Sequence, residues 1–286
     1  MPVRAIGISL KPDQSQLGAL VREIDKWLRE RDVEALLGPE AAKASGLPGV
    51  PRSELADRVD VMLALGGDGT LLAVARAIGK RPVPILGVNL GTLGYLAEIG
   101  LDELFATLEL VLSDGLRIET RMRLDVVAER GGAEIGRYLA LNDAVIARTA
   151  LSRMIDVQAW ADDAEVTTYH GDGVIAATPT GSSAYSLSAG GPLLLPGIGA
   201  IVLTPICPHT LTQRPLVLPE SCRIAIQLID MRGGEAHLTV DGQVGCDLRE
   251  GDRVSVRASD SPLRMLVHAN RNRFEVMRSK LRWGAR

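Results

Sequence analysis

The sequence predicts a two-domain protein, with an N-terminal doubly wound α/β domain followed by a C-terminal all-β, sandwich-like domain. Over about the first hundred residues, short apolar runs alternate with helical spacing, which is typical of βα units around a parallel sheet. From about residue 116 the pattern changes to period-two stretches broken by Gly, Pro and Asp, which is typical of short strands joined by turns. A chain of 286 residues is long enough to bury a core in each domain.

The N-terminal region reads as alternating strands and helices. The apolar runs predict buried strands, and apolar residues spaced three and four apart predict helices. The strands are expected at 3–10, 59–67 and 83–91, and the helices at about 14–30, 70–79 and 102–115. A glycine at the end of the last helix is a typical stop signal.

The C-terminal region contains six clear period-two stretches, which predict a β-sandwich-like domain. They are LDVVAER, GRYLALNDAVIAR, MIDVQAWAD, RIAIQLID, AHLTVDG and RVSVRAS. The tail regains helical spacing at Phe274, Met277 and Leu281, which predicts a C-terminal helix packed on the first domain. The expected domains are therefore 1–115 with the tail 268–286, and 116–267.

The composition argues against several classes of protein. A net charge of −3 with two Phe, four Tyr and three Trp gives no support for a nucleic-acid surface. No apolar run approaches the length of a membrane span, and the N-terminus lacks a secretory pattern, so a cytoplasmic protein is expected. Cys207, Cys222 and Cys246 are odd in number and far apart, which suits reduced packing residues.

The first motif that carries chemistry is Gly66, Gly67, Asp68, Gly69 and Thr70, between the end of a predicted strand and the start of a helix. A helix N-terminus attracts phosphate, and three glycines allow close approach of the backbone and φ > 0. A carboxylate in such a place should repel an anion unless it binds Mg²⁺ or accepts a proton from an attacking hydroxyl. The alternative is a tight strand–helix turn in which Asp68 is the N-cap.

The second motif runs from Thr178 through Thr180 to Ser183, Ala184 and Tyr185. Hydroxyl groups and small residues suit a loop that hydrogen-bonds a sugar or a polar heterocycle, with Tyr185 against an aromatic ring. An ordinary Ser/Thr/Gly turn is the alternative.

The pair Asn142 and Asp143 offers an amide and a carboxylate that could grip ribose hydroxyls. A β-turn is the alternative interpretation of the same pair.

These motifs together resemble bacterial NAD kinases over nearly the whole chain. The resemblance rests on motifs in the order and approximate spacing of that family: GGDGTLL at 66–72, ND at 142–143, DGVIAATPTGSSAYSLSAGGP at 172–192, PHTLTQRPLV at 208–217, DGQ at 241–243 and the SKLRWG tail. The GGDG motif alone is weak evidence for this family, because diacylglycerol kinases, sphingosine kinases and 6-phosphofructokinases share it. The block at 172–192 together with PHTL and RP is highly specific.

The resemblance implies a kinase that transfers the γ-phosphoryl group of ATP, or of polyphosphate, to the 2′-hydroxyl of the adenosine ribose of NAD. NAD would lie between an α/β and an all-β domain, in a homodimer or homotetramer. Mg²⁺ would arrive with the triphosphate, without a dedicated protein metal site. No nucleic acid or membrane partner is implied.

The resemblance also implies roles for single residues. Asp68 would orient or deprotonate the 2′-hydroxyl, while the Gly66–Thr70 backbone faces phosphate. The remaining residues would bind NAD: Asn142 and Asp143 on the adenosine half, Thr178, Thr180, Ser183, Ala184 and Tyr185 in the adenine-side loop, Asp172 near the nicotinamide, and Gln243 of the DGQ motif.

Two positions depart from the common family pattern. Ser183 replaces a threonine and keeps the hydroxyl, whereas His170 stands where many members have an arginine. A large or charged side chain there is associated with a preference for NAD over NADH, so His170 is expected to be intermediate. A hydrogen-bonded structural histidine is the alternative. The other histidines, His209, His237 and His268, lack the close spacing of a metal motif.

Two other functions stay open at this point. One is a GGDG-type lipid kinase of the diacylglycerol or sphingosine class, for which the chain lacks a cationic amphipathic stretch. The other is a regulator that binds a dinucleotide without turnover, to which the carboxylate of Asp68 would bring no benefit.

Overall fold

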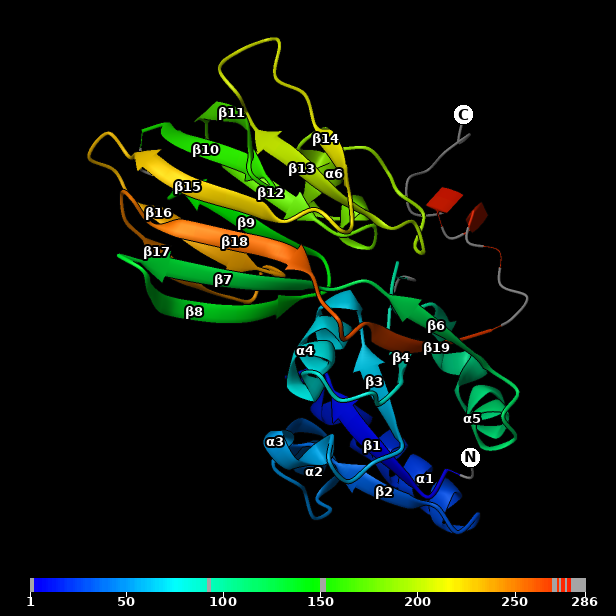
Figure 1. Ribbon diagram of the computed structural model, residues 1–286. Coiled ribbons are helices and arrows are strands. Elements are labelled where there is room, and N and C mark those ends of the chain that lie inside the picture. The colour runs from blue at the N-terminus through cyan, green and yellow to red at the C-terminus, as the bar shows by residue number, and fades with distance from the viewer. Residues whose placement is uncertain are drawn as a thin grey trace. The chain divides into compact units, whose positions relative to one another are not determined.

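The computed structural model describes residues 3–91, 94–149, 153–268, 272, 274, 275, 277 and 278. The chain divides into two compact units, coloured along the sequence in Figure 1. Unit 1 consists of Met1–Thr120 and Leu263–Arg286, and unit 2 of Arg121–Pro262.

Unit 1 is built on a seven-stranded sheet in which β5 pairs with β4 and the other strands have the order β2-β1-β3-β4-β19-β6. The pairs β1/β2, β1/β3, β3/β4, β4/β5 and β4/β19 are parallel. The strands are β1 (Ala5–Leu10), β2 (Glu34–Leu37), β3 (Val61–Gly66), β4 (Ile85–Asn89), β5 (Ile99–Gly100), β6 (Arg117–Arg121) and β19 (Leu263–Val267).

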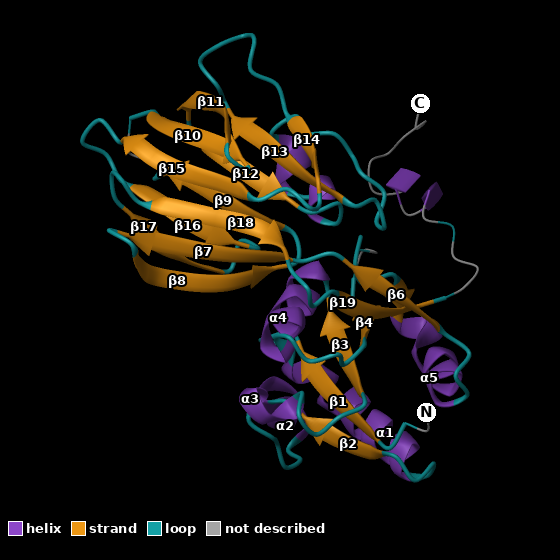
Figure 2. Cartoon of the chain, in the orientation of Figure 1, coloured by secondary structure: helices purple, strands orange, loops and turns teal. Residues whose placement is uncertain are grey.

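The helices of the described residues gather mainly in unit 1 (Figure 2). They are η1 (Ser15–Leu17), α1 (Gly18–Arg29), α2 (Pro39–Ser45), α3 (Arg52–Leu55), α4 (Asp68–Ile78), η2 (Leu101–Glu103) and α5 (Leu104–Leu112). Helix α1 buries Val21, Ile24 and Leu28 in the same apolar cluster as Ile6 and Leu63 of the sheet. Every residue of β3 is buried, as expected for a parallel strand with both faces covered.

Unit 2 consists of two six-stranded antiparallel sheets, which confirms the predicted α/β plus all-β class. One sheet has the order β11-β10-β15-β18-β7-β8, and the other β14-β13-β12-β9-β16-β17. Their inner faces share one core, which includes Val126 and Val157 from the first sheet and Val174 and Leu238 from the second. Alternate residues of β10 and β16 are buried, so the period-two pattern in the sequence marks the inner face.

The elements of unit 2 follow one another along the chain as strands, interrupted by the short helices η3 (Gly181–Ser183) and α6 (Tyr185–Ser188). The strands are β7 (Leu124–Arg130), β8 (Ala133–Ala140), β9 (Asp143–Arg148), β10 (Ile155–Ala161), β11 (Ala164–Gly171), β12 (Gly173–Ala177), β13 (Ala200–Ile206), β14 (Leu216–Pro219), β15 (Ile224–Asp230), β16 (Ala236–Val240), β17 (Val244–Leu248) and β18 (Arg253–Ala258).

The unit boundaries differ from those expected from the sequence. The first unit extends to Thr120 rather than residue 115, and the chain returns to it at Leu263 rather than at residue 268. The reason is that β6 and β19, at the two crossings, extend the sheet of unit 1. Their period-two texture resembles that of the strands of unit 2, so sequence pattern alone assigned 116–120 and 263–267 to the second domain.

The predicted C-terminal helix lies largely outside the described residues. Phe274, Glu275, Met277 and Arg278 are helical, and Leu281 is among the residues that are not described. The described part of the chain contains no helix with the length and apolar character needed to cross a membrane.

Candidate active site

The glycine motif of unit 1 lies at the carboxyl end of β3, where α4 begins. Gly66 is the last residue of β3, Gly67 is the extended N-cap residue, and Asp68 is the first residue of α4. The amides of Thr70 and Leu71 donate to the carbonyl oxygen of Gly67 and close the first turn. The motif therefore occupies the edge of a parallel sheet at which α/β proteins bind ligands, at the positive end of a helix.

The three glycines serve packing and access rather than a left-handed backbone. None of Gly66, Gly67 and Gly69 has a positive φ, so the expectation of φ > 0 is wrong. A Cβ on Gly66 would lie 2.6 Å from the Cβ of Thr70, which excludes a side chain there. Nothing lies within 4 Å of a Cβ built on Gly67 or Gly69, so this backbone faces open space.

The carboxylate of Asp68 is held by backbone amides from a segment far along the chain. Its Oδ2 accepts the amide of Tyr95 at 3.0 Å, and its Oδ1 accepts the amides of Leu96 at 3.0 Å and Ala97 at 3.1 Å. The alternative reading of Asp68 as an N-cap is wrong, because Gly67 has that position and no side chain caps the helix. Burial, and then the negative charge of Asp68, raise the pKa of the Tyr95 phenol.

Asn89 lies at the same edge of the sheet as the glycine motif and is a further candidate residue of this site, which the sequence motifs do not include. It is the last residue of β4, beside β3, and is buried. Its Oδ1 accepts the amide of Gly91 at 2.8 Å, and its Nδ2 donates to the carbonyl of Ala97 at 3.4 Å. The sequence did contain a signal for Asn89, because it is a polar residue at the end of an apolar run. Such a position at the carboxyl end of a buried parallel strand is where α/β proteins place ligand-binding residues.

In unit 2, Asn142 and Asp143 lie at the start of β9 and are fixed by Asp241. The carboxylate of Asp241 accepts the amides of Leu141 at 2.9 Å, Asn142 at 2.7 Å and Asp143 at 3.1 Å. In return, the amide of Asp241 donates to the carbonyl of Asp143 at 3.0 Å. Asp241 and Gly242 have φ of 51° and 66°, so the DGQ motif is a tight turn between β16 and β17 that presents this carboxylate.

The same turn carries Gln243, whose amide donates to the carbonyl of Val240 at 3.0 Å. Gln243 therefore lies two residues after Asp241 in the same turn, and its contact with NAD stays a prediction.

The Asp241 cradle is the turn whose carboxylate holds the backbone of residues 141–143. The pKa values of Asp143 and of the buried Arg123 are both shifted, and the charge of Asp241 acts on both. Burial, with the negative charge of Asp241 as a second cause, raises the pKa of Asp143 from 3.8 to about 7. Burial lowers the pKa of Arg123 to about 10, against the opposing effects of Asp125 and Asp241. Arg123 therefore remains a cation at neutral pH, whereas the pKa of Asp143 lies near neutrality, where its carboxyl gains or loses a proton.

The raised pKa of Asp143 predicts a pH-dependent stability. Its neutral form is favoured in the fold, so its contribution is complete below about pH 4 and is lost as pH rises towards 7. Between about pH 5.5 and 8.5, the wild type should lose about 2 kcal/mol more unfolding free energy than Asp143→Asn, which cannot ionise. Denaturant titrations of both proteins at the two pH values measure the difference. Equal losses in the two proteins would show that Asp143 does not titrate in this range.

The TPTG turn, residues 178–181, packs directly on the segment that contains Asn142 and Asp143. Thr178 Oγ1 donates to the carbonyl of Leu141 at 2.6 Å and accepts the amide of Gly181 at 3.0 Å. The amide of Thr178 donates to the carbonyl of Asn142 at 2.8 Å. A Cβ on Gly181 would lie 2.7 Å from the Cα of Asn142, so glycine is required for this contact. The structure thus brings two of the predicted motifs together.

The rest of the second motif forms η3 and α6 rather than an extended loop. Ser183 Oγ donates to the carbonyl of Thr180, itself buried, at 3.0 Å. Ala184 joins the two short helices, and Tyr185 begins α6 with 46% of its surface exposed. An exposed aromatic ring beside buried hydroxyl groups is available to a ligand.

His170 and Asp172 flank the end of β11 and have different partners. Asp172 Oδ1 accepts Arg148 Nε at 2.6 Å. His170 Nδ1 is paired with the carboxylate of Asp156, and its ring centroid lies 5.9 Å from that of His209. The contact with Asp156 favours the interpretation of His170 as a structural histidine, while its partly exposed ring leaves the ligand-binding interpretation open.

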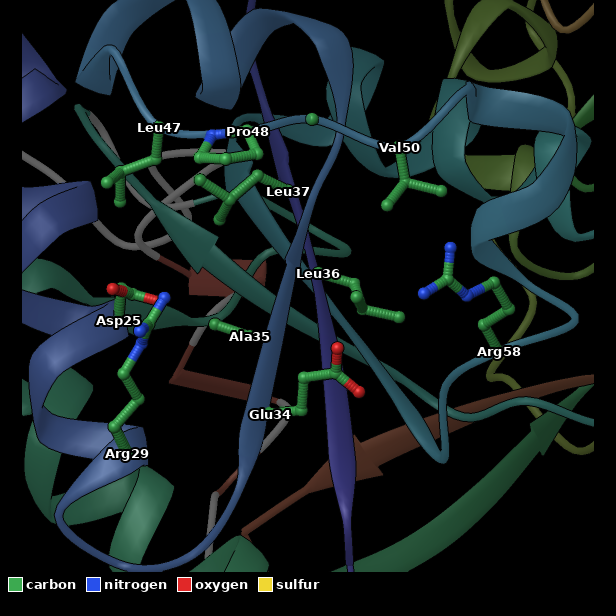
Figure 3. A pocket seen from close by; sticks show the side chains of 11 residues that line it. Asp25, Arg29, Glu34, Ala35, Leu36, Leu37, Leu47, Pro48, Val50 and Arg58 are labelled. Atoms are coloured by element: carbon green, nitrogen blue, oxygen red, sulfur yellow. The ribbon is translucent and has the colours of Figure 1, made fainter.

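A separate pocket of about 470 Å³ lies along β2 in unit 1 and contains none of the predicted site residues (Figure 3). Asp25 and Arg29, ion-paired at 3.0 Å, are among its lining residues, as are Glu34 and Arg58. We give it no role in the chemistry of the glycine motif.

A protein cage for a metal ion is not seen in the described ranges, which contain no group of three or more His, Cys, Asp or Glu side chains placed to hold one. Near the glycine motif, Asp68 is the acid whose carboxylate faces the segment after β4.

Comparisons with known proteins agree for both units. Residues 6–116 match the family model described as the ATP-NAD kinase N-terminal domain, and residues 141–268 match the ATP-NAD kinase C-terminal domain. The NAD kinase of Geobacter metallireducens is 42% identical over 284 residues, covering 99% of this chain and 100% of the relative. The NAD kinase of Syntrophotalea carbinolica is 44% identical over 286 residues, with the same coverage.

Two solved structures are similar over nearly the full length. Yeast NADH kinase complexed with NADH superimposes with a TM-score of 0.91 at 29% identity, covering 100% of this chain and 89% of that one. An NAD kinase from Archaeoglobus fulgidus in complex with ATP gives a TM-score of 0.78 at 28% identity, with 98% of each chain covered.

Proposed function

The chain belongs to the ATP-NAD kinase family, and from that premise we propose how its own residues phosphorylate NAD. The activity is transfer of the γ-phosphoryl group of ATP to the 2′-hydroxyl of the adenosine ribose of NAD, giving NADP and ADP. A bond forms between the ribose oxygen and the γ-phosphorus, the bond from that phosphorus to the β,γ-bridging oxygen breaks, and the hydroxyl proton is released. The lipid kinase alternative is not favoured, since the relatives named above are NAD or NADH kinases.

The observation that supports the mechanism most strongly is the fixed carboxylate of Asp68 at the start of α4. We assign Asp68 to accept the hydrogen bond of the 2′-hydroxyl and so direct its oxygen to the phosphorus. The backbone of Gly66–Thr70 would face phosphate, helped by the open space at Gly67 and Gly69 and by the positive end of α4.

In unit 2 the cradle made by Asp241 would present Asn142 and Asp143 to the adenosine half of NAD. The raised pKa of Asp143 lets its carboxyl either donate or accept a hydrogen bond to a ribose hydroxyl near neutral pH. The hydroxyl of Thr178 is already hydrogen-bonded to the carbonyl of Leu141 and the amide of Gly181. We therefore assign Thr178 to shape the loop rather than to contact NAD. Tyr185, Ala184, Ser183 and Thr180 remain proposed contacts of the adenine side, and Gln243 remains a proposed contact of NAD.

His170 and Asp172 are proposed for the nicotinamide end. Asp172 is oriented by Arg148, and His170 by Asp156, so both side chains are held near the end of β11. Mg²⁺ is proposed to bind with ATP, where it would neutralise charge on the triphosphate. A cytoplasmic homodimer or homotetramer is proposed for the assembly.

The activity is tested with purified protein, Mg²⁺, NAD or NADH, and ATP or polyphosphate, with NADP(H) scored by a dehydrogenase specific for the phosphorylated cofactor. Diacylglycerol vesicles with ATP form the control arm. Formation of NADP without phosphorylated lipid is expected. Lipid phosphorylation, or NAD binding without turnover, would overturn the assignment.

Tyr185 provides a test of the adenine-side loop. Tyr185→Ala should weaken NAD binding by about 1–2 kcal/mol, because an exposed ring would lose its contact with the adenine or its ribose. The KM for ATP should change less. Calorimetry measures the affinity, and Tyr185→Phe, which keeps the ring, is the matched control. Unaltered NAD affinity in a folded Tyr185→Ala protein would remove this residue from the site.

A further inference from the structure

The three amides on Asp68 leave its two carboxylate oxygens in different states. Oδ1 accepts two amides, from Leu96 and Ala97, and Oδ2 accepts one, from Tyr95. Each carboxylate oxygen has about two lone-pair sites. With respect to donors from the described residues, the lone pairs of Oδ1 are therefore occupied, and Oδ2 retains one site for a further donor.

Gly94 lies against the same carboxylate and has no room for a side chain. A Cβ on Gly94 would lie 2.8 Å from Cγ of Asp68 and even closer to its Oδ1. The three atoms nearest to that Cβ all belong to the side chain of Asp68, and none of them to the backbone. The need for glycine at this position therefore comes from the side chain of Asp68.

The segment that supplies the amides is anchored independently of Asp68. Leu96 and Ala97 are buried, with 5% and 1% of their surfaces exposed. The amide of Gly94 donates to the carbonyl of Ala97 at 3.1 Å, and the same carbonyl accepts Asn89 Nδ2. Because the segment is buried and held by its own hydrogen bonds, it can fix the position of a side chain that it contacts.

We propose that Gly94–Ala97 is the positioning element of the reaction. It fixes the carboxylate of Asp68 so that Oδ2 is the oxygen that receives the 2′-hydroxyl, and Gly94 is required because a side chain there would displace that carboxylate. This inference rests on the proposed role of Asp68. The positioning residues act only through Asp68 and do not need to touch substrate.

The first experiment compares Gly94→Ala with Gly91→Ala. A displacement of Asp68 by about 1 Å should lower kcat by about 10- to 100-fold with little change in the KM for NAD, because orientation rather than binding is lost. Gly91 is the matched control, since a Cβ there would meet nothing closer than Asn89 Oδ1 at 4.0 Å. Its kcat should stay within about twofold of wild type. Equal kcat in the two variants would overturn the proposal.

A double-mutant cycle separates positioning from a general structural effect. In the Asp68→Asn background, adding Gly94→Ala should lower kcat no further, since both changes disable the same group. Independent, multiplying losses would contradict action through Asp68. A fully active Asp68→Asn protein would instead remove the proposed role of Asp68, which is a different result from a harmless Gly94→Ala.

Amide hydrogen exchange tests the contact without relying on the folding of Gly94→Ala. The amides of Tyr95, Leu96 and Ala97 should be protected in the wild type and exchange at least about tenfold faster in Asp68→Ala, where their acceptor is gone. The amide of Gly91, which donates to Asn89, should keep its rate. Unchanged protection of all three amides would show that Asp68 is not their partner in solution.

Discussion

Replacing Asp68 by asparagine is expected to lower kcat for NAD phosphorylation by about 10²-fold or more, with NAD affinity close to wild type. Asparagine keeps one carbonyl oxygen, but its NH₂ group cannot accept a hydrogen bond. With the NH₂ group in the place of Oδ2, the variant loses the acceptor for both the Tyr95 amide and the 2′-hydroxyl. With the NH₂ group in the place of Oδ1, it loses the acceptor for the amides of Leu96 and Ala97, which hold the side chain in position. Steady-state kinetics give kcat, and calorimetry gives the NAD affinity.

Asp57→Asn is the matched control for this substitution. Asp57 is an exposed acid of the same unit whose carboxylate is ion-paired with Arg81, outside the glycine motif and the segment Gly94–Ala97. Its kcat should be that of the wild type. An Asp68→Asn protein with nearly unchanged kcat would exclude Asp68 from the chemical step.

The Asp241→Ala variant is expected to lose about 3 kcal/mol of unfolding free energy, the largest loss of stability that we predict. Three backbone amides donate to this one carboxylate, and each loses a charged acceptor in the variant. The buried Arg123 also loses a neighbouring negative charge. Because these amides belong to Leu141, Asn142 and Asp143, NAD affinity should fall as well.

Asp241→Asn separates geometry from charge. It keeps one oxygen acceptor of the same shape, so it should retain more stability than Asp241→Ala. It also removes the negative charge that helps to raise the pKa of Asp143, which should move back towards 3.8. Denaturant unfolding and NAD titrations of both variants check these outcomes. If Asp241→Ala unfolded as the wild type does, the cradle would contribute nothing to stability.

Strong periodicity made most of the fold predictable. The buried runs at 59–67 and 83–91 correspond to β3 and β4, and LDVVAER corresponds to β7. In contrast, β2 was missed because its four residues, EALL, are too few to show a period-two pattern.

The site was predictable where chemistry is visible in the residue type, as with the acid within the glycine motif. It was not predictable where a residue acts through a distant backbone. Asp241 is 98 residues from the amide of Asp143, and Asp68 is 27 residues from that of Tyr95. No local pattern encodes such a contact, and likewise only the fold shows that Gly94 faces a carboxylate.

The position of β19 has a consequence for the order in which the protein is made. This strand pairs with β4 through Met265 and Ile85, and in the sheet it lies between β4 and β6. During translation, all of unit 2 is therefore synthesised before β19, which is a strand of the sheet of unit 1. Domains tend to fold as they emerge from the ribosome. Unit 2 can therefore complete its core while the sheet of unit 1 still lacks Leu263–Val267. The N-terminal sheet is thus the first to be started and the last to be finished.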